Sequence, residues 1–511
     1  MDYFVRIWLR LAPGVFTAGE GTAVLMAVLG LAWLTAVAEP AAPIPPEALS
    51  RAVERELRAD PVLQEADLYA ISRAGEVTLG GTVDRLLWQR RAERVAETVR
   101  GVRAVVNRIA IRSPGHVPDH ELAERVQRLL ASSPALRSAM GVEAEVQTGE
   151  VHLRGQVASF AAKEWADDLV ASVVGVRKVH NELTVAPGRN LADAALAEAV
   201  RRAFTFDALL ADDRIEVSVS GGRVQLSGEV RSAAERRRAR LRAVSAGAAE
   251  VDVSRLVVSH EQHWGPRTPL PDEAIARAVN EALAADPQLQ AYTFAVSVNG
   301  GRVDLGGTLP TLLDRRIAAR VVQQVRGVRQ LRDGLTTRAE VTDMRALEAR
   351  AREALRADPL VGDQPIAVKV KKQVAVLTGS AATPWQRQHA ETVVAAVAGI
   401  TDVRNELRSV QRAPYNGDKP YVGAPYFTVN DRRPAPGQAA STEDATLAEA
   451  VQAQLQWSAF LDATDVRVSV NRGVATLTGR VPTRFQAAMA TQEAYEGGAR
   501  LVKNLLSIGE R

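Results

Sequence analysis

The sequence predicts an α+β protein made of six tandem copies of one small domain, preceded by an N-terminal transmembrane or signal helix. Three observations lead to this prediction. A short apolar strand that ends on a glycine recurs six times along the 511 residues. An alternating strand and a turn precede it, and amphipathic helical segments stand on both sides. Each copy is therefore expected to be an αββαβ unit, a three-stranded mixed sheet packed on two helices.

The recurring strand defines the repeat. It reads VTLGG from Val77 and VQLSG from Val224, and its glycine returns after 72 to 79 residues, with one interval of 100 residues before the last copy. We interpret this glycine as structural, because it allows close backbone approach between the second strand and the helix that follows. The six repeat glycines are Gly81, Gly155, Gly228, Gly307, Gly379 and Gly479.

Two helices flank each hairpin. In the fourth copy, apolar residues from Ile275 to Leu283 follow helical spacing after Asp272, which we expect to be the N-cap. Asp-Pro at 286–287 ends this helix because proline blocks its continuation, and the same stop stands at 60–61 and 358–359, with Ser-Pro at 133–134. The second helix is expected to run to another glycine, such as Gly101 or Gly327, which closes it in the left-handed conformation.

The second strand, second helix and third strand form a crossover long enough to make the third strand parallel to the second. We number the six copies modules 1 to 6. The expected boundaries are 1–46 for the membrane segment and a proline-rich spacer, 47–112, 118–185, 190–259, 271–338 and 342–410 for modules 1 to 5, 411–442 for a linker, and 443–508 for module 6.

Residues 22–38 form an uncharged apolar run that follows Arg6 and Arg10. As a helix this run spans about 25 Å, which lies on the border between a signal peptide and a short membrane-spanning helix. We expect an uncleaved inner-membrane anchor with the repeats in the periplasm. The alternatives are a signal cleaved after Ala38, which leaves a soluble periplasmic protein, and a buried helix.

The composition and the lack of known catalytic motifs argue against most kinds of catalytic and metal site. The 64 Lys and Arg nearly balance the 60 Asp and Glu, so no general polyanion-binding field is expected, and the lack of cysteine excludes disulfides and thiolate sites. No phosphate-binding loop, nucleophile elbow or zinc-protease motif appears, and the pairs His116/His120 and His260/His263 fall in links between modules. We therefore expect no enzyme activity, catalytic residue, cofactor, metal, nucleic acid or small-molecule substrate.

The second helix of module 3 is strongly basic, with six arginines and one glutamate in 231–242. This helix either contacts anionic lipid headgroups or is an exposed helix face without a ligand. Module 1 has a weaker basic stretch at 85–94, whereas module 2 has Glu164, Asp167 and Asp168 on the same helix, so only some modules are expected to bind lipid. The candidate anionic-lipid contacts are Arg231, Arg236, Arg237, Arg238, Arg240 and Arg242.

The linker at 411–442 holds Tyr415, Tyr421, Tyr426 and Phe427 among prolines and glycines. Aromatic residues at this density are unusual for a plain linker. The segment is expected either to pack on module 6 or to meet a partner.

The apolar-x-leucine-x-glycine strand, the 20-residue interval to a second glycine in four modules, and the V-x-N ending together resemble the BON domain family. The resemblance implies a cell-envelope protein that attaches to phospholipid surfaces or to partner proteins without catalysis. The expected function is multivalent association of the tandem modules with anionic phospholipid membrane, supporting envelope integrity or stress response. The alternative is a periplasmic interaction scaffold whose modules dock on each other, including self-association, or on an envelope complex.

Overall fold

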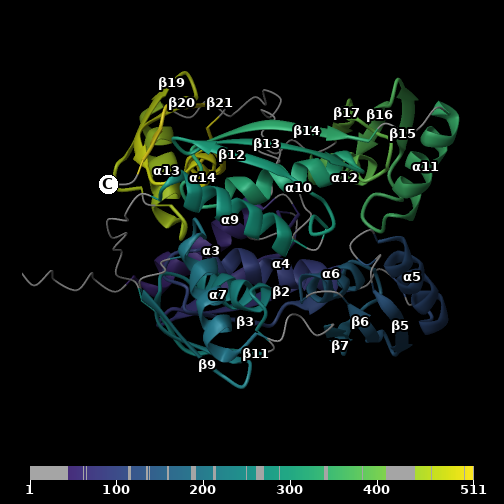
Figure 1. Ribbon diagram of the computed structural model, residues 1–511, viewed down its shortest axis with the longest axis horizontal. Coiled ribbons are helices and arrows are strands. Elements are labelled where there is room, and N and C mark those ends of the chain that lie inside the picture. The colour runs from purple at the N-terminus through teal and green to yellow at the C-terminus, as the bar shows by residue number, and fades with distance from the viewer. Residues whose placement is uncertain are drawn as a thin grey trace, which may run out of the picture. The chain divides into compact units, whose positions relative to one another are not determined.

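The computed structural model describes residues 44–509 except 61, 65, 113–114, 116, 134–135, 137–138, 158–159, 186–190, 211–213, 249, 260–269, 287, 339–342, 383, 410–443, 462 and 500. Within these residues, twelve helices and six small sheets follow one another in the expected order, which confirms the repeated α+β architecture (Figure 1). The predicted membrane segment at 22–38, the linker at 411–442, and His116, His260 and His263 lie outside the described residues. Across the described part, no helix has both the length and the apolar character needed to cross a bilayer.

Each module begins with a helix and a β-hairpin. The first helices are α3 (Pro46–Ala59), α5 (Asp119–Ser132), α7 (Asp193–Thr205), α9 (Asp272–Ala285), α11 (Met344–Ala357) and α13 (Asp444–Trp457). The hairpins are β1 (Leu68–Arg73) with β2 (Glu76–Val83), β5 (Met140–Gln147) with β6 (Glu150–Val157), β9 (Ile215–Ser220) with β10 (Arg223–Val230), β12 (Ala295–Asn299) with β13 (Arg302–Leu309), β15 (Ile366–Lys371) with β16 (Val374–Ala381), and β19 (Val466–Asn471) with β20 (Val474–Val481).

A second helix and a third strand complete each module. The second helices are α4 (Leu86–Glu97), α6 (Phe160–Ala171), α8 (Ala233–Ser245), α10 (Leu312–Gln323), α12 (Pro384–Ala395) and α14 (Arg484–Glu496). The third strand is continuous in β11 (Glu250–Val258) and β14 (Gln330–Thr337). Elsewhere it is split into β3 (Ala104–Asn107) and β4 (Ala110–Ile111), β7 (Lys178–Asn181) and β8 (Thr184–Val185), β17 (Asp402–Asn405) and β18 (Arg408–Ser409), and β21 (Leu501–Asn504) and β22 (Ser507–Ile508).

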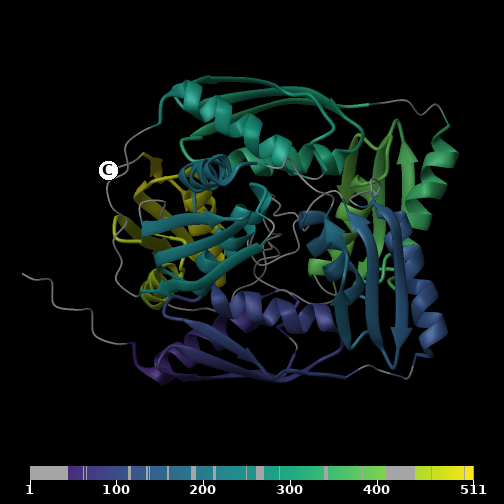
Figure 2. The ribbon, with the colours of Figure 1, turned by 60° about the horizontal axis from the view of Figure 1, so that its bottom comes forward.

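The second strand of each hairpin is the central strand of its sheet. In module 1, β2 pairs antiparallel with β1 and parallel with β3, and the other modules repeat this mixed arrangement. One face of the sheet is buried against the helices, with Val77 and Leu79 fully enclosed, while Tyr69 and Ile71 on the opposite face are exposed. Figure 2 shows both helices of a module on the same side of its sheet.

The repeat glycine is required by a close contact inside the hairpin. Gly81 has a φ of +116°, and a Cβ at this position would lie 2.0 Å from the carbonyl oxygen of Asp67. Asp67 immediately precedes β1, whose Leu68 pairs with Gly81. The close approach is therefore made to the start of the first strand, which corrects the expectation that the following helix is the close neighbour.

The predicted N-cap residue Asp272 has a different role. The N-cap of α9 is Pro271, without a side-chain cap, and the carboxylate of Asp272 accepts hydrogen bonds from the backbone N–H groups of Gly300 at 2.7 Å and Gly301 at 3.0 Å. These N–H groups belong to the β12–β13 turn, where they need an acceptor. Asp119, Asp193 and Asp444 hold the turns of modules 2, 3 and 6 in the same way.

The second helix is shorter than the sequence predicts. In module 1, α4 ends at Glu97, and residues 98–101 form a separate turn before β3. Gly101 does adopt a left-handed φ of +96°, but it ends this turn and not the helix. The turn leaves the backbone groups of Thr98 and Arg100 available to another module.

Candidate docking surfaces between the modules

A polar residue at or just after the C-cap of the first helix is held by the second helix of the same module. In four modules its partner is the side chain ten residues after the repeat glycine. The pairs are Asp60 with Arg91 at 2.8 Å, Ser133 with Trp165 at 2.8 Å, Asp207 with Arg238 at 2.7 Å, and Asp358 with His389 at 3.0 Å. This polar contact ties the two helices of a module together at the end that meets other modules.

Module 4 departs from this pattern. Its helix-stop residue is Asp286, and the position ten residues after Gly307 is the buried apolar residue Ile317. Burial raises the pKa of Asp286 to about 6, although backbone hydrogen bonds and Arg320 act in the opposite direction. Asp286 is therefore the residue at this position whose negative charge is poorly compensated.

Opposite charges meet where the second helices of modules 1 and 2 contact each other. Arg90 of α4 forms an ion pair with Asp167 of α6, and Arg94 donates to Asp168 at 2.8 Å. Asp168 is almost fully buried. Asp167 and Asp168, which argue against a lipid-binding face in module 2, thus pair with arginines of module 1.

The basic helix α8 of module 3 contacts both α4 and α6. Arg237 pairs with Glu97 of module 1 at 2.6 Å, and Arg236 donates to the carbonyl of Arg103 at 3.0 Å. Arg240 is exposed and lies close enough to Glu164 of module 2 to oppose part of the rise that burial causes in the pKa of that carboxyl. Arginines on two faces of α8 therefore serve junctions with neighbouring modules.

The remaining candidate arginines make ion pairs inside module 3, and Arg238 also donates to Gln324 of module 4 at 3.4 Å. Arg231 is buried and pairs with Glu235 at 2.8 Å. Arg238 and Arg242 both donate to Asp207, at 2.7 and 2.6 Å. The six arginines singled out from the sequence are thus brought together on one short segment, and contacts within the chain engage them.

The carboxylates at the junction of modules 1 to 3 are poorly solvated. Burial is the largest influence on Glu97, Glu164 and Asp167, and it raises the pKa of each although arginines lie nearby. Bringing both partners of an ion pair out of water costs free energy that their attraction only partly returns. Such pairs mainly select the correct partner, because a like charge in the same place would be strongly unfavourable.

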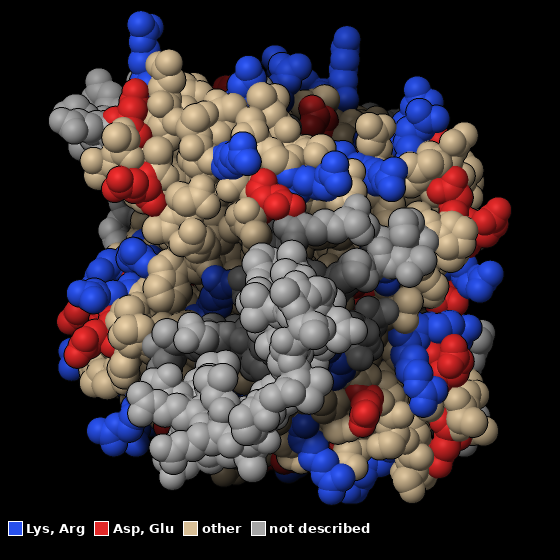
Figure 3. Space-filling model, turned by 90° about the vertical axis from the view of Figure 1, so that its left-hand side faces the viewer, with Lys and Arg blue, Asp and Glu red and all other residues tan. Residues whose placement is uncertain are grey.

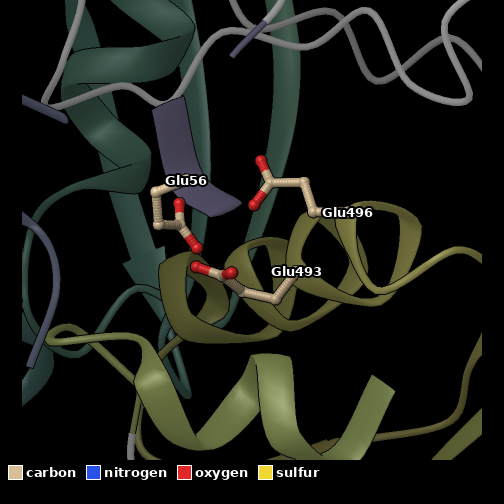
Figure 4. A group of neighbouring side chains, drawn as sticks. All are labelled: Glu56, Glu493 and Glu496. Atoms are coloured by element: carbon tan, nitrogen blue, oxygen red, sulfur yellow. The ribbon is translucent and has the colours of Figure 1, made fainter. Parts of the chain in front are cut away.

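Modules 1 and 6 share a buried polar contact. The amide of Gln454 on α13 donates to Glu493 at 3.0 Å, to Glu496 at 3.4 Å and also to Glu56 of α3. Figure 4 shows the three glutamate side chains near one another. The three carboxylates lie close to one another, and the NH₂ group of Gln454 is a hydrogen-bond donor in this otherwise acidic group.

Other junctions are apolar. Leu209 and Ala234 of module 3 form a buried cluster with Ala459, Phe460, Phe485 and Met489 of module 6. The cores of modules 4 and 5 merge into one cluster, which the ion pair of Arg316 with Glu391 at 2.7 Å accompanies. Modules 1, 2, 4 and 5 border a cavity of about 270 Å³, whose apolar lining includes Trp165 and Val393.

The outer surface shows no single field of charge on the face drawn in Figure 3. There Lys and Arg side chains alternate with Asp and Glu around the described part of the face. This distribution agrees with the near balance of charges in the sequence.

The basic helix is recognisable in the sequence, but the groups of other modules that it contacts are not. The available signal was the opposite sign of charge at matching positions of the second helix, Arg94 in module 1 and Asp168 in module 2, both thirteen residues after the repeat glycine. A second signal was the residue ten positions after that glycine, which is polar in some modules and apolar in others. Neither signal names the partner without the three-dimensional arrangement.

Known proteins place this chain in a family. The BON domain model matches residues 47–113, 118–187, 192–259, 271–339, 343–411 and 443–510. No curated protein matches the chain. Two similar solved structures are of CdsD, a structural protein of the type III secretion system of Chlamydia trachomatis. One is 16% identical with a TM-score of 0.12 and covers 45% of this chain and 90% of that chain. The other, its C-terminal domain, is 13% identical with a TM-score of 0.12 and covers 42% and 100%. The six matches show that the chain belongs to the BON domain family and carries six copies of the domain.

Proposed function

We propose that this chain is a non-enzymatic scaffold of the cell envelope, in which the BON modules dock on each other through complementary helix faces. One observation carries the proposal: the arginines of α4 and α8 lie on carboxylates of other modules, as Arg94 does on Asp168 and Arg237 does on Glu97. The helices that seemed suited to lipid headgroups are used inside the chain. Membership of the BON family supports the envelope location.

Several weak junctions suit such a scaffold. Each ion pair contributes little net stability after its desolvation cost. Tandem linkage raises the effective concentration of one module near the next, so weak contacts suffice to hold the modules together. The exposed sheet faces, such as the one that carries Tyr69 and Ile71, remain accessible to a further envelope protein.

Charge reversal tests this proposal. Arg94→Glu and Asp168→Arg each place like charges together, and each is expected to lower the thermal unfolding temperature and to increase the hydrodynamic radius. The double variant restores opposite charges and is expected to recover most of both values. Arg128→Glu is the matched control, since Arg128 pairs with Glu124 on an exposed surface of α5. The proposal is wrong if the single variants match the control and the double variant shows no recovery.

Phospholipid association is the second candidate function. The observation in its favour is the excess of arginine on α8, where Arg236 and Arg240 retain exposed area. A fragment of residues 44–511, which forms a compact unit, is incubated with vesicles that contain or lack anionic lipid, at low and high salt. Sedimentation only with anionic vesicles, reduced by salt and by Arg236→Ala with Arg240→Ala, would support lipid contact. No sedimentation under any condition would exclude it for the modules.

A further inference from the structure

Two junctions between modules have the same pattern of backbone hydrogen bonds. Where module 3 meets module 4, the N–H of Ala208 donates to the carbonyl of Gln324 at 3.2 Å. The N–H of Arg326 donates in return to the carbonyl of Phe206 at 2.9 Å. Asp207 and Val325 stand opposite each other as an antiparallel bridge between these two bonds.

The junction of modules 6 and 1 repeats this arrangement. The N–H of Ala459 donates to the carbonyl of Thr98 at 3.1 Å, and the N–H of Arg100 donates to the carbonyl of Trp457 at 3.0 Å. The residues between them, Ser458 and Val99, again form an antiparallel bridge. In both junctions, the segment after the first helix of one module pairs with the turn after the second helix of the other.

An arginine side chain reinforces each pair. Arg100 Nη1 donates to the carbonyl of Gln456 at 3.0 Å, and Arg326 Nη1 donates to the carbonyl of Thr205 at 3.4 Å. Both carbonyls belong to the last turn of a helix, where no intrahelical partner remains and a positive charge is favourable.

The sequence allows these contacts in some modules and forbids them in others. The N–H donor is alanine in modules 3 and 6, whereas the other four modules have proline, which has no N–H to donate. The residues at this position are Pro61, Pro134, Ala208, Pro287, Pro359 and Ala459. The residue before the second glycine is arginine in modules 1 and 4 alone, and this position holds Arg100, Val174, Ala246, Arg326, Ala398 and Gly497.

We propose that these two positions form a docking code that selects which modules join. The non-proline residue after the helix stop is one half of the code, and the arginine before the second glycine is the other half. A module with one half takes as its partner a module with the other half, as module 6 does with module 1 and module 3 does with module 4. Modules 2 and 5 have neither half. This inference rests on the proposed scaffold function.

Disulfide trapping in the full chain tests the code. The chain has no cysteine, so Val99→Cys with Ser458→Cys introduces the only thiols, at two positions that face each other across an antiparallel bridge. Rapid oxidation to a cross-linked product is expected. Adding Ala459→Pro is expected to slow cross-linking by at least about tenfold because the donor N–H is lost. Proline is native at this position in four modules, so the module fold accommodates it.

Two further variants make the result specific. Adding Arg100→Ala, which leaves module 6 unchanged, is expected to slow cross-linking severalfold. Adding Ala208→Pro is the matched control, since it removes the same donor from the other junction and is expected to leave cross-linking of modules 1 and 6 unchanged. A cross-linked dimer that depends on Ala459 in the same way would also support the code, acting between two copies of the chain.

The outcomes separate this inference from the scaffold proposal. If the two cysteines fail to cross-link in the otherwise native chain, modules 1 and 6 do not dock and both proposals fail. If they cross-link and neither Ala459→Pro nor Arg100→Ala changes the rate, the modules dock but the code is wrong.

Discussion

Nε of Arg238 lies 2.7 Å from Oδ1 of Asp207, a carboxylate that is almost completely buried at the junction of modules 3 and 4. Arg242 donates to the same carboxylate at 2.6 Å. Burial by itself would raise the pKa of Asp207, but the two arginines outweigh it and lower the pKa to about 2. The basic helix thus neutralises an internal charge at the residue that also forms the bridge to module 4.

Removing this carboxylate should destabilise module 3. Asp207→Ala leaves Arg238 buried without its counter-charge and is expected to lower the free energy of unfolding by about 3–5 kcal/mol. Urea unfolding at pH 7 measures the change. Glu198→Ala is the control, because Glu198 pairs with Arg201 on an exposed surface and its removal should change the free energy by less than about 0.5 kcal/mol. Equal effects of the two substitutions would contradict the assignment.

The same pair predicts an acid dependence. The pKa of Asp207 is lower in the folded state than in the unfolded chain, so its contribution is complete above about pH 4 and is lost as the pH falls toward 2. The difference in free energy of unfolding between the native protein and Asp207→Ala should therefore shrink over this range. A difference that stays constant from pH 5 to pH 2 would show that the carboxylate is not held by the arginines.

Asp286 should behave in the opposite sense. Its raised pKa of about 6 means that the folded state holds a proton that the unfolded chain releases near pH 4, so stability falls as the pH rises from about 4 to 6. Asp286→Asn keeps an oxygen that accepts the N–H of Gln288 and removes the charge. It is expected to raise the free energy of unfolding by about 1–3 kcal/mol at pH 7 and to have little effect at pH 4.

The corresponding substitution in module 1 is the matched comparison. Asp60→Asn removes the charge that faces Arg91 at 2.8 Å and is expected to destabilise the protein at pH 7. Opposite signs for the two Asp→Asn substitutions, measured by urea unfolding, would confirm that the residue ten positions after the repeat glycine decides the effect. The same sign in both modules would refute that explanation.

The repeat glycine should be far less tolerant than a turn glycine in the same module. Gly228 has a φ of +110°, and a Cβ there would lie 2.0 Å from the carbonyl oxygen of Arg214, whereas Gly221 has a φ of +60° with open space around it. Gly221→Ala is expected to cost about 1–2 kcal/mol from backbone strain. Gly228→Ala adds a backbone clash and is expected to cost more than about 3 kcal/mol. Thermal unfolding that gave equal losses would rule out the clash.

The aspartate that holds the hairpin turn in modules 2, 3, 4 and 6 gives a local prediction. The backbone N–H groups of Gly222 and Gly221 lower the pKa of Asp193, so this contact is complete at neutral pH and is lost only as the pH falls through that lowered value. Asp193→Ala is expected to speed hydrogen exchange of both amides at pH 7, as followed by mass spectrometry of the β9–β10 turn. Asp272→Ala, which affects only the turn of module 4, should leave exchange in this segment unchanged.

The fold of a single module follows from local patterns. The helical spacing after Asp272, the alternation in β1 and the recurring glycine each involve residues a few positions apart, and together they predict the mixed three-stranded sheet that the structure has. The local expectation for Asp272 was wrong because another segment competes for its carboxylate. The carboxylate of Asp272 accepts hydrogen bonds from the N–H groups of Gly300 and Gly301 and does not cap its own helix.

What the sequence by itself determined is the repeat, the αββαβ unit and its place in the BON family. The pairing of the modules became visible only in the tertiary structure. Arg94 and Asp168 are 74 residues apart, and Arg100 and Gln456 are 356 residues apart. No periodic pattern links residues at such separations. The arginines that the sequence offered as a surface for lipid are in contact with groups of their own module or of other modules in the folded arrangement, because a buried charge is stable only where the fold brings an opposite charge or a carbonyl against it.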